Sequence, residues 1–214
     1  MRDMETTAST TVSLASVTLE VADVEAARHF YTAFGVGAHV RLRPSEAPST
    51  GFRGFTLGLT VSGPATVDGF FDAAVDAGAE VLKPATKSLW GYGGVVRAPD
   101  GTIWKIATSE KKNTGPDTRR IDDLVLLLGV EAVKTTRQFY TDRGLTVAKS
   151  FGSKYVEFAA GPSTPVKLAL YKRRALAKDL GVPVDGTGSH RVVLGSTTDT
   201  FTDPDGFTWE PTAA

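Results

Sequence analysis

Two short motifs recur in the same order along this chain, and this duplication constrains the fold more than any other feature. The later motif is a proline-led turn followed by a tryptophan: Pro99-Asp100-Gly101 with Trp104, and Pro204-Asp205-Gly206 with Trp209. The earlier motif is an aromatic pair and a threonine, as Phe30-Tyr31-Thr32 and Phe139-Tyr140-Thr141. The offset between copies is similar for both motifs, so the sequence indicates two related halves in tandem.

The apolar pattern predicts the same order of elements in both halves. Residues 55–107 and residues 121–171 each have the pattern of a strand, a helix and three strands. A shorter unit lies at each end of the chain, and a further short helix is predicted over residues 173–180. The predicted fold class is therefore α+β, with tandem βαβββ units that form curved, mostly antiparallel sheets and carry helices on the outer face.

Composition shifts divide the chain into four parts. We expect a flexible Thr-rich tail over residues 1–11, a first half over 12–109, a polar linker over 110–118 and a second half over 119–214. A sheet that is covered by helices on its convex face leaves a concave face free. We expect a small organic molecule to bind there.

Charge and cysteine content exclude several classes of function. Lys+Arg and Asp+Glu both number 24, and this balance argues against a nucleic acid or an anionic membrane as partner. The chain has no cysteine, so disulfides and thiolate zinc sites are excluded, which fits a cytoplasmic location. We find no secretory signal and no apolar run long enough to cross a bilayer. A monomer and a homodimer both remain open.

These motifs resemble one known superfamily. A strand, a helix that carries Asp23 and Phe30-Tyr31 and ends at Gly35, and a later Pro-Asp-Gly turn before a final strand are similar to the vicinal oxygen chelate superfamily. This superfamily includes glyoxalase I, bleomycin-resistance proteins and extradiol dioxygenases. The resemblance covers nearly all of the chain in two copies and implies a glyoxalase-like fold. It does not fix the activity, because this fold hosts several chemistries and pure binders.

The resemblance also implies where a metal would be bound, since ligands in metal-dependent members come from the first and last strands of each unit. In the first half these positions match Ser16 and Lys105, which are poor ligands. In the second half they match Asp123, His190 and Glu210, while the fourth position matches Ala169. Such a set would suit divalent Fe, Mn, Ni or Zn. The alternative is that these carboxylates are solvated or ion-paired and that the chain holds no metal.

Large aromatic residues are the other candidates for a binding site. Trp90 and Tyr92 lie in a glycine-rich stretch, residues 89–94, that we expect to be an open loop. In the resembled superfamily the matching region borders the ligand cleft. Phe151, Tyr155 and Tyr171 are further candidates to line a cleft, with packing in the core as the alternative for each.

Three functions remain open at this point. The first is a glyoxalase/bleomycin-resistance-like protein that binds a small, partly aromatic molecule in a concave cleft without a metal. The second is a divalent-metal-dependent lyase, isomerase or dioxygenase that uses Asp123, His190 and Glu210. The third is a non-catalytic scaffold with a vestigial cleft. Whether the chain is an enzyme is thus undecided by its sequence.

Overall fold

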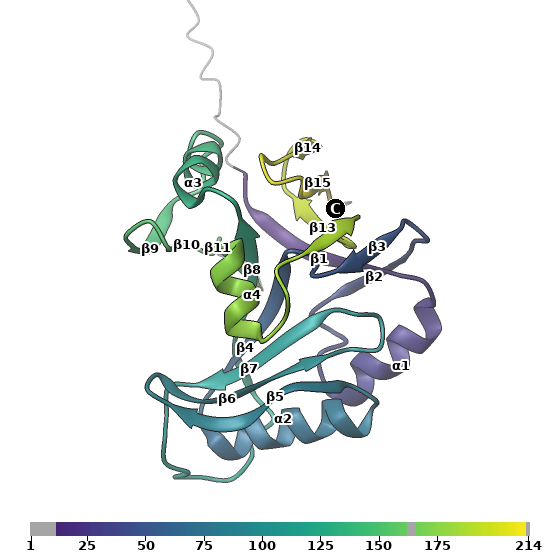
Figure 1. The fold of residues 1–214 in the computed structure, drawn as a ribbon, viewed down its shortest axis with the longest axis vertical. Helices are drawn as coiled ribbons and strands as arrows, with labels where there is room; N and C mark the ends of the chain where they lie inside the picture. The colour runs from purple at the N-terminus through teal and green to yellow at the C-terminus, as the bar shows by residue number, and fades with distance from the viewer. Residues whose placement is uncertain (1–11, 162–165, 213–214) are drawn as a thin grey trace, which may run out of the picture.

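The structure is a computed structural model that describes residues 12–161 and 166–212, and the predicted tail over residues 1–11 lies outside this part (Figure 1). The helices are α1 (Val24–Phe34), α2 (Pro64–Asp76), α3 (Val133–Thr141) and α4 (Arg173–Leu180). The strands are β1 (Leu14–Val21), β2 (Arg41–Pro44), β3 (Ser49–Gly51), β4 (Phe55–Val61), β5 (Glu80–Ser88), β6 (Gly91–Arg97), β7 (Ile103–Thr108), β8 (Ile121–Val130), β9 (Val147–Phe151), β10 (Tyr155–Phe158), β11 (Val166–Lys172), β12 (Gly186–Gly188), β13 (Val192–Ser196), β14 (Phe201–Thr202) and β15 (Thr208–Pro211).

Two main sheets organise the molecule. The large sheet has eight strands in the order β5-β6-β7-β4-β8-β11-β10-β9, and the small sheet has five in the order β14-β15-β13-β1-β2. Strands β12 and β3 form a short two-stranded ribbon. Most neighbouring strands in the described residues are antiparallel, but four pairs run parallel: β4 with β7, β8 with β11, β1 with β2, and β13 with β15. The predicted α+β class with mostly antiparallel sheets is confirmed.

Each sheet contains strands from both halves of the sequence. In the large sheet β4 pairs with β8 antiparallel, with Leu57 opposite Leu126. In the small sheet β1 pairs with β13 antiparallel, with Val17 opposite Leu194, and Figure 1 shows these two ends of the chain side by side. The full units therefore pair with each other, and the short units at the two ends of the chain pair with each other.

Helices α1, α2 and α3 cover the outer faces, and the repeated motifs meet there. Helix α1 begins at Asp23, whose side chain caps the Ala26 amide, and ends at Gly35, which has a φ of 92°. Its Tyr31 ring lies 5.8 Å from the fully buried Trp104 ring. In the second half the ring of Tyr140, on α3, lies 5.5 Å from that of the fully buried Trp209. In each half, the helix that carries the Phe-Tyr pair thus packs on the strand that follows the Pro-Asp-Gly turn.

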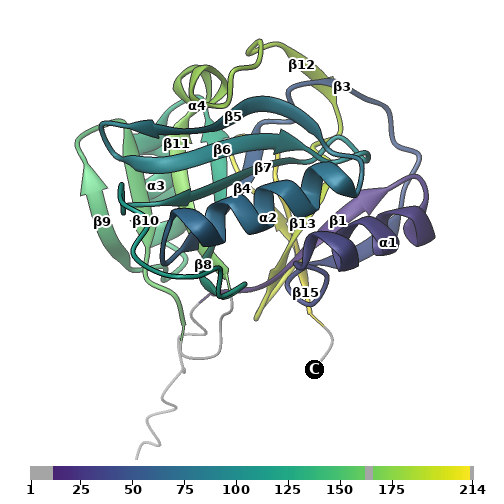
Figure 2. The ribbon, with the colours of Figure 1, turned by 90° about the horizontal axis from the view of Figure 1, so that it is seen from below.

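Helix α4 differs, because it packs on the concave face of the large sheet. Its Leu176, Ala177 and Leu180 are buried in a cluster with Val95 and Ile103. The neighbours of these two strand residues, Val96 and Trp104, belong to the core on the other face, since successive side chains alternate across a strand. Figure 2 shows α2 and α4 on opposite sides of strands β5, β6 and β7. The expectation that helices occupy only the outer face is therefore corrected for α4.

Candidate ligand-binding groove

The structure does not bring the three predicted metal ligands together. Asp123 lies on β8 of the large sheet, Glu210 lies on β15 of the small sheet, and His190 precedes β13. Asp123 is already neutralised, because its Oδ1 lies 2.6 Å from Nζ of Lys167 on the neighbouring strand β11. The two carboxylates therefore belong to different sites.

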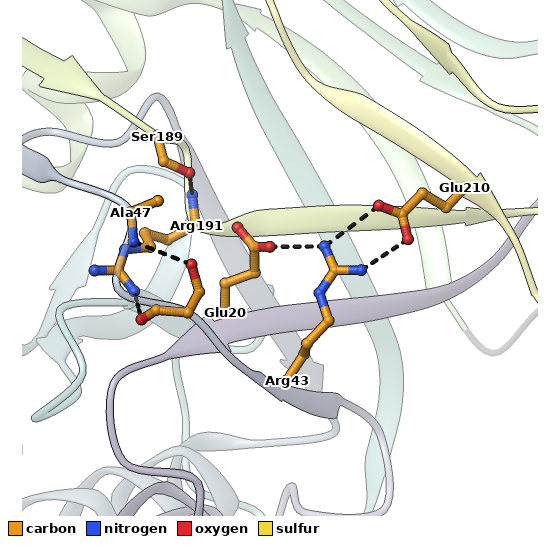
Figure 3. Close-up of polar contacts among 7 residues, drawn as sticks. Glu20, Arg43, Ala47, Ser189, Arg191 and Glu210 are labelled. Carbon is orange, nitrogen blue, oxygen red and sulfur yellow. Dashed lines mark hydrogen bonds and ion pairs between the residues drawn. The ribbon is translucent and has the colours of Figure 1, made fainter.

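Glu210 is held by an arginine on the concave face of the small sheet (Figure 3). The guanidinium of Arg43 donates to both carboxylate oxygens of Glu210, at 2.8 and 3.3 Å, and to Oε1 of Glu20 at 2.7 Å. These hydrogen bonds, first those to Glu210 and then that to Glu20, raise the pKa of Arg43 above its ordinary value. Arg43 thus supplies the positive charge that Glu210 needs, and sequence reasoning missed it because its partners are 23 and 167 residues away.

His190 serves the packing between segments. Its two ring nitrogens face the backbone carbonyls of Arg53 and Asp205, and its ring stacks on Phe207 with 4.0 Å between ring centroids. Neither nitrogen is aimed at Asp123 or Glu210. The imidazole therefore connects the segment before β13 to the turn at residues 204–206.

The residues present do not fit a divalent metal. Within residues 12–161 and 166–212, no group of three or more His, Cys, Asp or Glu side chains is arranged to hold an ion. Lys105 and Ala169 stand on the large sheet and Ser16 on the small one, none of them a strong ligand. Where carboxylates do occur at the expected positions, Arg43 and Lys167 already compensate them.

Three of the predicted aromatic residues form a cluster at the end of the large sheet that consists of β9, β10 and β11. The ring of Tyr155 lies 5.8 Å from that of Phe151 and 6.3 Å from that of Tyr171. The Tyr155 hydroxyl donates to Oε2 of Glu157 at 2.8 Å, and burial together with this carboxylate raises the pKa of Tyr155. Phe151 is 68% exposed, whereas Tyr171 packs against the cluster around α4.

The other two aromatic residues, Trp90 and Tyr92, lie at the opposite end of the large sheet, where β5 and β6 meet, and both are in the lining of one groove. Trp90 is 85% exposed at the turn between β5 and β6. The Tyr92 hydroxyl donates to Oδ1 of Asp68 on α2 at 2.6 Å, so this side chain lies on the outer face. That hydrogen bond, and then burial, raises the pKa of Tyr92 to about 12. The five predicted residues thus do not share one cleft.

The glycine-rich stretch around them is a hairpin and not an open loop. Strand β6 begins at Gly91, directly after the turn, and pairs with β5 on one side and β7 on the other. A Cβ built on Gly93 would lie 2.6 Å from the carbonyl oxygen of Ile106 on β7, and one on Gly91 would collide with the Thr108 backbone. Glycine is needed here because the two backbones approach closely.

A groove of about 370 Å³ lies on the concave face of β5, β6 and β7. Its lining includes Gly93 and Ala107 along the strands, Trp90 at the hairpin turn, and Lys105 with Asp179 of α4. This volume falls within the roughly 300–1,000 Å³ that is typical of small-molecule sites. The side chains between the two ends of the groove are small, so the strand backbone itself forms much of the surface.

Two lysines join this groove to α4. The ammonium of Lys105 lies 2.6 Å from Oδ2 of Asp179. The ammonium of Lys83 donates to the backbone carbonyls of Lys178 and Asp179, the last carbonyls of the helix, at 3.2 and 2.5 Å. Cations are favourable at a helix C-terminus, where carbonyl groups lack partners within the helix. Lys83 therefore holds the end of α4 that borders the groove, and Lys105 forms an exposed ion pair beside it.

Two other cavities are smaller than this groove and are bordered by arginines. One of about 310 Å³ lies beside Phe52 and Arg53, and one of about 260 Å³ lies between the start of α1 and Arg191. Arg53 donates to the Asp100 carbonyl and Arg191 to the Ser45 carbonyl, so both arginines brace backbone segments. Burial lowers the pKa of Arg53. Neither cavity has an exposed aromatic ring comparable to Trp90 in its lining.

Comparisons with known proteins identify the fold. No protein-family profile and no curated protein sequence matches this chain. Among solved structures, it is similar to glyoxalase I from Zea mays, with 12% identity and a TM-score of 0.58 over 92% of this chain and 91% of that one. It is also similar to a putative dioxygenase from Bacillus subtilis subsp. subtilis str. 168, with 10% identity and a TM-score of 0.59 over 93% of this chain and 84% of that one. The helices in the described part are all too short or too polar to cross a membrane. The chain therefore has a glyoxalase-like fold.

Proposed function

We propose that this protein binds a small, partly aromatic organic molecule in the groove beside Trp90, without a metal ion. The observation that carries this proposal is a groove of about 370 Å³ whose rim holds an 85% exposed tryptophan. An indole ring can stack on an aromatic ligand, and Trp90 is exposed where a ligand in the groove would reach it. The glyoxalase-like fold supports the choice of a concave face.

The physical basis of binding would be ring stacking and apolar burial. A planar ring can lie against the backbone at Gly93 and Ala107 while its edge or face contacts the Trp90 indole. Burial contributes about 25 cal/mol for each Å² of apolar surface, before the cost of ordering the ligand. Small residues along the strands favour flat molecules over branched ones.

A second candidate function is the scaffold with a vestigial cleft, and helix α4 favours it. The buried Leu176, Ala177 and Leu180 occupy the centre of the concave face, where a ligand would otherwise have most contact. The metal-dependent lyase, isomerase or dioxygenase has no such support, because the donor set does not fit a divalent ion.

Intrinsic fluorescence tests the proposal, because Trp90 is the exposed one of the three tryptophans and Trp104 and Trp209 are fully buried. A panel of nitroaromatic compounds, which quench indole emission, is titrated into the wild type and into two variants. Ala107→Leu narrows the groove and keeps Trp90, and Leu89→Ala alters the neighbouring exposed residue of the same turn as a matched control.

We expect saturable quenching in the wild type and in Leu89→Ala, and its loss in Ala107→Leu. Trp90→Phe should remove the signal, which shows that the buried tryptophans do not report. A linear, unsaturable response in the wild type, or an equal response in Ala107→Leu, would reject the groove and leave the scaffold candidate.

A further inference from the structure

We infer that the molecule bound in this groove carries an acidic group, and that Lys105 binds this group in exchange for Asp179. The inference rests on the proposed function and adds the chemical class of the ligand. Among the residues that line the groove, two are cationic, Lys83 and Lys105, and one is anionic, Asp179, so the lining has a net charge of 2 − 1 = +1.

The two lysines differ in how firmly they are held. Lys83 donates to two backbone carbonyls at the end of α4, which cannot move without the helix. Lys105 is paired with the side chain of Asp179 alone, and the two side chains are 39% and 40% exposed. Ion pairs with this degree of exposure contribute little to stability, because water and salt screen them. Lys105 is therefore the cation that a ligand can recruit.

Asp179 is suited to give way. It lies in the last turn of α4, where the unpaired carbonyl groups carry partial negative charge and disfavour a carboxylate. Its side chain is exposed enough to turn into water when Lys105 leaves it. The exchange replaces one carboxylate on the lysine by another, so its cost in electrostatic energy is small.

The spacing along the strands fits an aromatic acid. Lys105 and Ala107 are two residues apart on β7, so their side chains lie on the same, concave side of the strand. At a rise of 3.3–3.4 Å per residue they are roughly 7 Å apart. Thr108, the next residue, pairs with Tyr92, which is two residues from Trp90 at the turn. A ring that lies on Ala107 beside the indole can therefore direct a carboxylate toward Lys105. A cationic ring compound would face net repulsion in the same place.

The inference is tested by isothermal titration calorimetry with three probes that share a nitrobenzene ring and differ in charge. At neutral pH 4-nitrobenzoate is an anion, 4-nitrobenzyl alcohol is neutral and 4-nitrobenzylamine is a cation. We expect the anion to bind about tenfold more tightly than the alcohol, which corresponds to about 1.4 kcal/mol for a charge-assisted hydrogen bond, and the amine to bind most weakly.

Variants assign this preference to the exchange. Lys105→Met should abolish the advantage of the anion over the alcohol, whereas Lys87→Met, on the exposed part of the same hairpin and outside the groove lining, should keep it. Asp179→Asn should tighten binding of the anion several-fold, because it removes the competing carboxylate, and should leave the alcohol unchanged. If the Lys105–Asp179 ion pair only held the groove in shape, Asp179→Asn would instead weaken binding of both probes.

The outcomes separate this inference from the proposed function. Binding of all three probes with equal affinity, or an unchanged preference in Lys105→Met, would reject the acidic ligand and leave the aromatic groove intact. Absence of binding by all three probes, together with unsaturable quenching across the wider panel, would reject both.

Discussion

The two sheets fill their concave faces by different physical means. The large sheet is covered at its centre by the apolar side of α4, with Leu176, Ala177 and Leu180 buried. The small sheet carries a charged network there, in which Arg43 joins Glu20 and Glu210. An apolar helix covers only the area that it touches, so a groove remains at the edge of the large sheet. The difference explains why our candidate ligand site lies on one sheet only.

The same contrast recurs on the outer faces. Behind the large sheet Trp104 packs against Tyr31 and Phe34, and its indole nitrogen has no hydrogen-bond partner. Behind the small sheet Trp209 donates to the Tyr140 hydroxyl, which in turn donates to the buried Asp203. The duplicated apolar contacts and a tyrosine–aspartate hydrogen bond are thus present in both copies, while the tryptophan nitrogen is hydrogen-bonded in the second copy only.

Removing apolar contact from α4 should have the largest effect on stability. Leu176→Ala leaves a cavity in the centre of the large sheet, and a fully buried leucine replaced by alanine costs about 3 kcal/mol of the free energy of unfolding. Urea denaturation measures this loss. Arg174→Ala, on the exposed side of the same helix, is the control and should change stability by less than about 0.5 kcal/mol. Equal losses in the two variants would show that α4 does not fill the sheet as described.

The paired tyrosines should differ by a smaller amount. Tyr140→Phe leaves an Asp203 oxygen and the Trp209 indole nitrogen without their partner, and we expect a loss of about 2 kcal/mol. Tyr31→Phe should cost about 1 kcal/mol, because the same oxygen of Asp100 keeps its hydrogen bond from Thr102. Thermal and urea unfolding of both variants provide the comparison. A greater loss in Tyr31→Phe would contradict the assignment of the polar network to the small sheet.

The charged network of the small sheet should give the smallest effect and the strongest dependence on salt. Arg43→Met leaves Glu20 and Glu210 without a cation, and we expect a loss of about 1 kcal/mol at low ionic strength that shrinks in concentrated salt. Arg28→Met, which breaks an exposed pair with Glu25, is the control and should be near neutral. A loss that is independent of salt would mean that Arg43 acts through packing.

Much of the fold was predictable from local signals. Asp23 and Gly35 mark the ends of α1, and the apolar spacing of residues 173–180 predicts α4, because caps and periodicity are properties of neighbouring residues. The glycine-rich stretch was interpreted as a loop, although Gly91 and Gly93 are glycines because β7 lies against them. Glycines occur in open loops and at close approaches of two strands alike, so the stretch by itself does not distinguish the two.

The site was less predictable, because its partners come from distant segments. Trp90 was identified from its setting and lies on the groove, but the position of α4 and the pairing of Lys105 with Asp179 depend on how the units pack. Likewise, nothing near Glu210 indicates that Arg43 will neutralise it. Superfamily position alone placed Asp123 and Glu210 in one site, whereas the pairing of end unit with end unit puts them in different sheets.

The pairing of β1 with β13 also bears on how this chain acquires its structure during synthesis. Strand β1 can pair early with β2, but its other edge has no partner until β13, near the last residues described, has left the ribosome. Contacts between such distant segments slow folding and prolong the exposure of apolar surface to water. We therefore expect the large sheet to assemble first and the small sheet to form last, in a late step that joins β1 to a strand more than 170 residues further along the polypeptide.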